Sequence, residues 1–303
     1  MKYKEWLKEW LEYYVKPRAK YRTHKVYEQQ VYKHIIPKLG EYELNELTAI
    51  VLQKFVVELI EKGLSSNTIN GIVNIMNNSL ETAVSLEKVG KHCVGLIQRP
   101  QSREKPVDCF DNHEQKKIER YILDNKKTNL YGIIISLYSG LRIGELLALT
   151  WDDLDLKKLT MSISKTCRDS WENGEYVKII DSTKTRSSER IIPIPKQLVS
   201  ILKELKKEST GQFVVTGRSK YGAQIRSFQR AFENLLNKLK IEHKGFHSLR
   251  HTFATRATEC GMDIKTLSEI LGHKNTSITL NRYAHSLFAH KINMMNKVGK
   301  NLV

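Results

Sequence analysis

The stretch Gly245–Tyr283, GFHSLRHTFATRATECGMDIKTLSEILGHKNTSITLNRY, contains groups suited to binding and attacking a phosphate. His247 and Arg250 stand three residues apart in what we predict to be the first turn of a helix, which places both side chains on one face. Gly261 is expected to end that helix, because glycine adopts the left-handed backbone conformation at low cost.

A second short helix is predicted from Ile264 to Leu271, closing at Gly272 and placing His273 just beyond its end. Tyr283 follows ten residues later. One guanidinium, two imidazoles and one phenol therefore gather in a short span. Since no carboxylate in the span is placed to hold a metal, we predict phosphate chemistry without one.

The chain has 303 residues, a formal net charge of +17 and a pI of about 9.6. Such a charge favours a polyanionic partner, above all nucleic acid, with a merely soluble basic protein as the alternative. Residues 1–100 hold 15 Lys and Arg against 11 Asp and Glu, and residues 101–303 hold 35 against 22. The second part is thus expected to bind phosphates more strongly.

The cysteine pattern and the N-terminus point to a soluble cytoplasmic protein. The four cysteines are scattered, form no C-x-x-C pair and have no zinc spacing, so unpaired thiols are expected. The N-terminal MKYKEWLKEWLEYY lacks an apolar signal region, and no stretch approaches the length of a membrane span.

Residues 1–97 are predicted to form a helical bundle, because apolar residues recur at helical spacing. Thr23 is expected to cap a helix with Val26, Val31 and Ile35 inward, and Ser66 to cap a long fourth helix. The first turn between helices is rich in basic residues: Lys16, Arg18, Lys20, Arg22 and Lys25. They are interpreted either as a solvated loop or as a clamp on a DNA backbone.

Residues 98–107, QRPQSREKPV from Gln98, have the composition of a linker, so residues 108–303 are predicted to form a second domain. Strands are expected at Leu159–Thr166, Tyr176–Ser182 and Glu189–Ile194. A tail helix is expected from about residue 286. The predicted fold class is mainly α with a small antiparallel β-sheet, α+β overall.

Two further residues are candidates for chemistry. Arg142 follows an apolar run, Leu130–Leu141, that breaks at Gly140; an arginine there is costly to bury unless it meets an anion, although ordinary capping is the alternative. Lys184 lies at a polar hairpin tip with Arg186, a candidate DNA contact, and a solvated lysine is the simpler interpretation. The acidic cluster Asp152, Asp153 and Asp155 is interpreted as a structural turn rather than a metal site.

Taken together, the motifs resemble those of the tyrosine recombinase (phage integrase) family. The matching pieces are S-G-L-R-I-G-E-L around Arg142, T-K-T-x-x-S-x-R around Lys184, H-S-L-R-H-T from His247, L-G-H ending at His273 and the tyrosine of T-L-N-R-Y. They occur in the family's order across roughly residues 108–290. The first domain resembles the family's core-binding domain by arrangement, and the whole is similar to integrases of conjugative transposons and Gram-positive phages.

The resemblance implies a role for each motif residue. Tyr283 is implied as the nucleophile that forms a 3′-phosphotyrosyl bond and releases a 5′-hydroxyl, and Glu145 as a brace. Arg142 and Arg250 are implied to bind the scissile phosphate, and Lys184 to act as the general acid. His247 is implied as the general base or proton relay, and His273 as a hydrogen-bond partner of the phosphate.

The resemblance also implies double-stranded DNA with specific recombination sites, a homotetramer passing through a Holliday junction, DNA-bending or direction-setting accessory proteins, and no metal, ATP or other cofactor. Three alternatives stay open: a topoisomerase-type or relaxase-like strand transferase, a resolvase, and a non-catalytic DNA-binding regulator. The tail helix is expected to dock on a neighbouring protomer or on its own domain. Many such integrases carry an N-terminal arm-binding domain, so either a short-form recombinase or a truncated chain is expected here.

Overall fold

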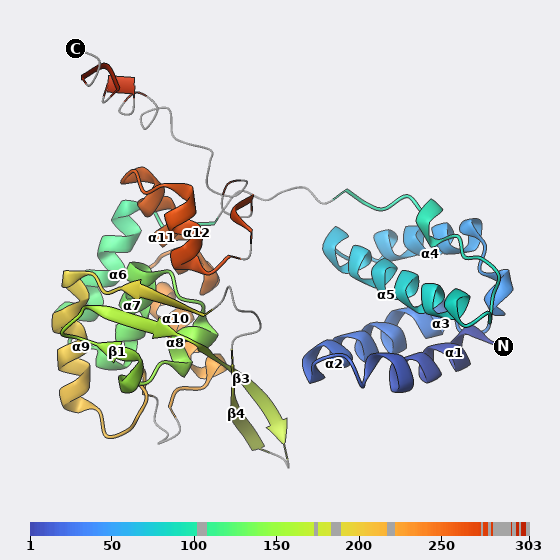
Figure 1. The fold of residues 1–303 in the computed structure, drawn as a ribbon, viewed down its shortest axis with the longest axis horizontal. Coiled ribbons are helices and arrows are strands. Elements are labelled where there is room, and N and C mark those ends of the chain that lie inside the picture. The colour runs from blue at the N-terminus through green and yellow to red at the C-terminus, as the bar shows by residue number, and fades with distance from the viewer. Residues whose placement is uncertain are drawn as a thin grey trace. The chain divides into compact units, whose positions relative to one another are not determined.

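Two units make up the chain in a computed structural model, Met1–Lys105 and Pro106–Val303 (Figure 1). The structure describes residues 1–101, 108–172, 175–182, 189–216, 222–273, 275–277, 280, 292, 295–296 and 298–300. Within these residues, no helix is both long enough and apolar enough to cross a bilayer. The predicted linker is described only in part, and the tail helix beginning at about residue 286 lies largely outside the described residues.

The N-terminal unit is helical throughout its described part. Its main helices are joined by short π-helical and 3₁₀ turns and pack around one apolar core that includes Trp6, Leu52, Ile72 and Met76. The elements are α1 (Tyr3–Trp10) continued by Leu11–Val15, α2 (Tyr21–Gln30) continued by Val31–Ile35, α3 (Ile36–Leu39), Leu44–Glu46, α4 (Ala49–Glu61), α5 (Ser66–Ser85) and Val94–Leu96.

Two predicted helix caps are wrong by a few residues. Thr23 lies inside α2, which begins at Tyr21, and Ser65 rather than Ser66 caps α5 by accepting a hydrogen bond from the Thr68 N–H. Val26 is 44% exposed, whereas Val31 and Ile35 are buried as predicted. The α2 segment therefore buries no side chain fully. It packs the partly buried Tyr27 against the core, and its continuation supplies the buried Val31 and Ile35.

Helices of the C-terminal unit surround α7, whose apolar sequence is buried almost throughout, as predicted. The α11 helix packs against α7, and α12 contacts both α11 and β5. The helices are α6 (Asn112–Asp124), α7 (Tyr131–Ser139), α8 (Ile143–Ala148), α9 (Lys196–Glu208), α10 (Ile225–Lys238), α11 (His247–Glu259) and α12 (Ile264–Leu271), with 3₁₀ turns at Thr128–Leu130 and Trp151–Asp153.

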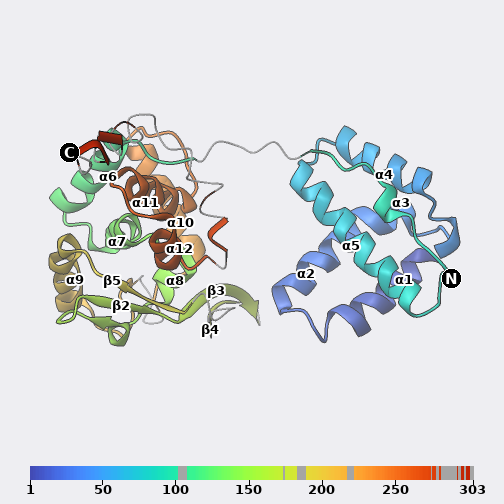
Figure 2. The ribbon, with the colours of Figure 1, turned by 45° about the horizontal axis from the view of Figure 1, so that its top comes forward.

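Two small antiparallel sheets complete the C-terminal unit. The three-stranded sheet, in the order β1-β2-β5, lies along one edge of the helical body (Figure 2). The β3-β4 pair forms a hairpin that projects from the unit in both views. The strands are β1 (Leu154–Asp155), β2 (Thr160–Ile163), β3 (Lys165–Glu172), β4 (Glu175–Ser182) and β5 (Arg190–Pro193).

The mainly helical architecture with small antiparallel sheets confirms the predicted fold class. One strand prediction needs correction, because Leu159–Thr166 is divided: β2 ends at Ile163 and β3 begins at Lys165. Met161 of β2 pairs with Ile192 of β5, so the two strands join apolar residues on the core side.

The start of the C-terminal unit is fastened to α11. The Phe110 N–H donates to the Thr252 hydroxyl at 2.8 Å, and Arg256 donates to the Phe110 carbonyl at 3.0 Å. Buried Phe110 also contacts Phe232 of α10 edge to face. These contacts tie the first residues of the unit to the middle of α11, whose first turn carries His247 and Arg250.

Candidate active site

Arg250 lies in the first turn of α11 and is only 2% exposed. Its guanidinium donates to the Gly140 carbonyl at 2.8 Å and to the Leu271 carbonyl at 2.7 Å. A buried guanidinium is tolerated when its donors are paired, and these two carbonyls come from the ends of α7 and α12. The side chain is thus held in one orientation by three elements.

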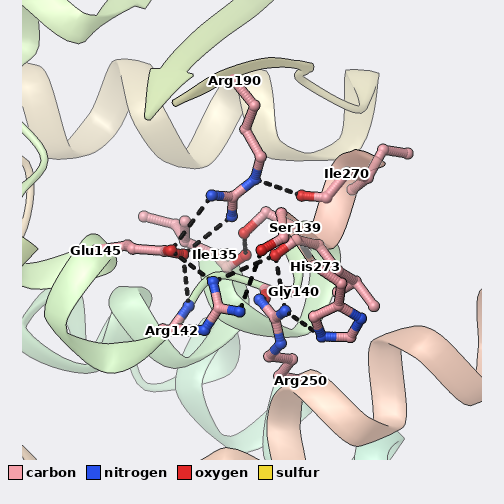
Figure 3. A network of polar contacts seen from close by, with 11 residues as sticks. Ile135, Ser139, Gly140, Arg142, Glu145, Arg190, Arg250, Ile270 and His273 are labelled. Carbon is pink, nitrogen blue, oxygen red and sulfur yellow. Dashed lines mark hydrogen bonds and ion pairs between the residues drawn. The ribbon is translucent and has the colours of Figure 1, made fainter. Parts of the chain in front are cut away.

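Arg142 reaches the same place from the N-terminus of α8. Its guanidinium donates to the Leu271 and Gly272 carbonyls, both at 3.3 Å, and pairs with Glu145 at 2.8 Å. Its side chain remains 38% exposed. The Leu271 carbonyl accepts hydrogen bonds from both arginines, so the two guanidiniums that were predicted from the sequence as candidates lie side by side (Figure 3).

His273 completes this cluster just beyond the end of α12. Its Nε2 lies 2.8 Å from a nitrogen of the Arg250 guanidinium, which can only donate, so the two groups form a hydrogen bond in the tautomer in which Nε2 accepts. The His273 backbone N–H donates to the Ser268 carbonyl at 3.0 Å, which fixes the residue relative to the helix.

Two glycines allow these elements to approach. Gly140 and Gly272 end α7 and α12 with φ of +65° and +64°, a conformation that favours glycine, as predicted for the second. A Cβ on Gly140 would lie 2.6 Å from the Phe253 ring, and one on Gly272 would lie 2.8 Å from an Arg190 nitrogen. A larger residue at either position would push apart the carbonyls that hold the arginines.

Glu145 and Arg190 form a buried ion pair next to the cluster. The two side chains are 4% and 7% exposed and lie 2.9 Å apart. Burial of the Glu145 carboxylate raises its pKa, but the hydrogen bond from Arg190 and the charges of Arg190 and Arg142 outweigh burial. The pKa of Glu145 therefore lies below its ordinary value, and the carboxylate is ionised at neutral pH.

His247 is the first residue of α11, one turn before Arg250, as predicted. It is exposed, and its ring meets the His251 ring edge to face with centroids 4.6 Å apart. Lys184, Arg186 and Tyr283 lie outside the described residues. The structure thus brings together Arg142, Arg250 and His273, and places His247 on the helix that carries Arg250.

The cluster has the chemistry of an anion site. Two guanidiniums can grip the oxygens of one phosphate and offset the charge that grows in a five-coordinate transition state. Among the described residues, no group of three or more His, Cys, Asp or Glu side chains has the arrangement of a metal site. Asp153 of the acidic cluster instead caps its turn through Thr150 and pairs with Lys165 at 2.8 Å.

Comparison with known families identifies the chain. Residues 110–290 match the phage integrase family, and residues 2–60 match the N-terminal SAM-like domain of phage integrases. The chain belongs to the phage integrase family. This confirms the sequence-based assignment, and the integrase is a tyrosine recombinase of the type found in mobile elements.

Named relatives of the integrase come from several bacteria. A tyrosine recombinase XerC-like protein of Caldanaerobacter subterraneus subsp. tengcongensis is 28% identical over 277 residues, covering 83% of this chain and 70% of that protein. The transposase from transposon Tn916 of Enterococcus faecalis is 26% identical over 283 residues, covering 87% and 69%. The ICEBs1 integrase of Bacillus subtilis is 26% identical over 273 residues, covering 86% and 73%.

Solved structures share the fold. The integrase of transposon Tn1549, solved in complex with a circular intermediate DNA, superposes with a TM-score of 0.84 at 23% identity and covers 98% of this chain and 99% of that one. A lambda integrase dimer bound to a core site superposes with a TM-score of 0.71 at 17% identity, covering 92% and 97%. Both therefore share the fold of this chain over most of its length.

Arg190 is the site residue that sequence reasoning missed. It entered only as the last letter of T-K-T-x-x-S-x-R, although its guanidinium contacts both Glu145 and the end of α12. The one available signal was an arginine at the start of an otherwise apolar strand, I-I-P-I, facing the core side of a small sheet.

Proposed function

We propose that this integrase cuts and rejoins double-stranded DNA at specific sites, through a 3′-phosphotyrosine intermediate, to integrate and excise a mobile element. The observation that carries the proposal is the Leu271 carbonyl shared by Arg142 and Arg250, with His273 beside them. Two separated motifs therefore supply one anion site of the kind that strand transfer requires.

Each step of the reaction has a candidate group. The Tyr283 phenol attacks the phosphorus, its proton passes to His247, and the bond from phosphorus to the 5′-oxygen breaks as Lys184 protonates that oxygen. Arg142, Arg250 and His273 stabilise the phosphate meanwhile. A 5′-hydroxyl of the partner duplex then reverses the step, so the bond energy is retained and neither ATP nor a metal is consumed.

The partner is proposed to be DNA bound by both units, with four copies at a Holliday junction. The net charge of +17 supports a polyanionic partner, and neighbours in fold were solved on core-site DNA and on a Holliday junction. Five exposed basic residues, of which the first three precede α2 and the last two lie within it, are proposed as the clamp of the N-terminal unit: Lys16, Arg18, Lys20, Arg22 and Lys25.

Covalent capture tests the proposal. Nicked duplexes tiled across the DNA that flanks the encoding gene should trap a protein–DNA adduct, because the nicked strand end diffuses away and prevents religation. Tyr283→Phe should abolish the adduct. Tyr121→Phe is the matched control, since it removes a hydroxyl from a ring on α6 that packs beside Lys238, and it should leave the adduct unchanged.

The outcomes separate the alternatives. An adduct that persists in Tyr283→Phe removes Tyr283 from its role. Relaxation of any supercoiled plasmid without junction intermediates would favour a topoisomerase-type enzyme, and tight binding without any adduct in the unaltered chain would favour a DNA-binding regulator.

A further inference from the structure

Arg190 joins three parts of the catalytic unit. It is the first residue of β5 and directly follows the segment that contains Lys184. Its Nε donates to the Ile270 carbonyl at 2.6 Å, and its two terminal nitrogens donate to the Glu145 carboxylate at 2.9 and 3.2 Å (Figure 3). One side chain thus ties β5 to α8 and to the end of α12.

The Glu145 carboxylate is shared between two arginines. Its Oε1 accepts from Arg142 at 2.8 Å and from Arg190 at 3.2 Å, and its Oε2 accepts from Arg190 at 2.9 Å. In a buried site, a carboxylate with a single cationic partner binds that partner strongly. Without Arg190, the full charge of Glu145 would act on Arg142 and oppose its transfer to a phosphate.

Arg190 also fixes the carbonyls that orient the phosphate-binding groups. Three consecutive carbonyls at the end of α12 accept hydrogen bonds from arginines. Ile270 accepts from Arg190, Leu271 from both Arg250 and Arg142, and Gly272 from Arg142. His273 follows directly. A cationic donor at this helix end also stabilises the negative end of the α12 dipole.

We propose that Arg190 is a positioning residue of the recombination reaction. It offsets part of the negative charge of Glu145, so that Arg142 remains available to the scissile phosphate. It also anchors the end of α12, which positions Arg250 and His273. This inference rests on the proposed function of the same cluster. It assigns Arg190 no contact with DNA.

Single-turnover adduct formation on the nicked duplexes tests this role, with DNA affinity and thermal unfolding measured alongside. Arg190→Ala should slow adduct formation by about 100-fold, the usual cost of misplacing reacting groups by about 1 Å, with little change in DNA affinity. Arg190→Lys keeps the charge but not the forked geometry, and it should lose about tenfold.

The double variant carries the decisive outcome. If Glu145 competes for Arg142 once Arg190 is gone, then Arg190→Ala/Glu145→Gln should form adduct faster than Arg190→Ala. The rate of Arg190→Ala relative to that of the unaltered chain should also rise as the pH falls from about 7 to 5, because loss of the Arg190 bond lets Glu145 protonate at higher pH. The double variant should show no such rise relative to the unaltered chain.

Arg256 supplies a matched control, because it too pairs with a carboxylate, Glu259, and donates to a backbone carbonyl, that of Phe110. Arg256→Ala and Arg256→Ala/Glu259→Gln should change stability without either kinetic signature. A double variant no faster than Arg190→Ala, or an Arg190→Lys rate equal to the unaltered one, overturns the inference. Failure of the proposed function is distinct, since it would show as an adduct that survives Tyr283→Phe.

Discussion

The two units bury different kinds of side chain. Within residues 1–101, the one polar side chain that is fully buried is that of Ser79, and ion pairs such as Lys2–Glu41 lie on the surface. The C-terminal unit instead buries Glu145 and Arg250. Burying charge costs free energy unless partners compensate. Among the described residues, the charged residues that are buried lie in the cluster at the α7 and α12 ends, which favours a functional role for that cluster.

The largest effect on this difference between the units is expected when the buried guanidinium of Arg250 is replaced by an ammonium, which keeps the positive charge but changes its shape. Arg250→Lys should slow adduct formation by about 10²–10³-fold, because an ammonium cannot reach the Gly140 carbonyl, the Leu271 carbonyl and His273 while gripping a phosphate in a forked geometry. Rapid-quench measurement on nicked duplexes at saturating protein gives the rate.

The same substitution elsewhere on α11 is the control. Arg256→Lys retains a charge beside Glu259 and should alter the rate by less than about threefold. Equal losses in the two variants would mean that α11 simply tolerates no lysine, and the distinction between the buried cluster and its surroundings would fail.

A smaller effect is expected on the free energy of unfolding and on its dependence on pH. The folded-state pKa of Glu145 lies below its ordinary value of 4.5, so its stabilising contribution is present above about pH 4.5 and is lost as the pH falls through the folded-state pKa. Glu145→Gln should therefore lower the free energy of unfolding by about 1.5–3 kcal/mol at pH 7, since it weakens hydrogen bonds to charged groups.

Urea unfolding from pH 7 down to pH 3 measures this difference. The gap between the unaltered chain and Glu145→Gln should stay constant down to about pH 5 and shrink below it. A gap that widens as the pH falls would contradict the sign. Glu259→Gln, which removes a partly exposed partner of Arg256 on the same unit, should give a much smaller gap at every pH.

Local patterns predicted much of the fold. The apolar run of α7, the first turn of α11 and the glycine ends of α11 and α12 all depend on neighbours in sequence, and the structure confirms them. The cap of α5 was missed by one residue, because Ser65 and Ser66 both suit an N-cap and only the backbone decides between them.

Long-range contacts were harder to foresee. Arg190 meets Glu145 and Ile270 across 45 and 80 residues, so no local pattern announces the pairing. The β3 strand was missed for a different reason: its sequence, KTCRDSWE, is too polar to alternate clearly. The Asn173-Gly174 dipeptide between the β3 and β4 sequences was the overlooked signal, since it is a strong indicator of a hairpin.

The smallest single-residue effect is expected on the N-terminal unit, where charges lie on the surface. Lys16 and Lys25 pair with Glu12 and Glu28, whereas no ion pair among the described residues involves Arg18, Lys20 or Arg22. The affinity for DNA falls with salt, and the slope of log affinity against log salt reports the number of phosphates bound. If these three residues bind phosphates, each change to alanine should make that slope shallower by about one.

A filter-binding series from about 50 to 200 mM salt measures that slope, and the matched control removes three lysines that already have acidic partners. Lys2, Lys4 and Lys38 pair with Glu41 and Glu58, so changing them to alanine removes the same formal charge and should alter the slope far less. The Arg18/Lys20/Arg22 triple variant should weaken binding yet form adduct at the unaltered rate once DNA saturates it. A reduced rate at saturation would mean that the N-terminal unit influences the chemistry as well as the binding, and the division of labour between the two units would have to be abandoned.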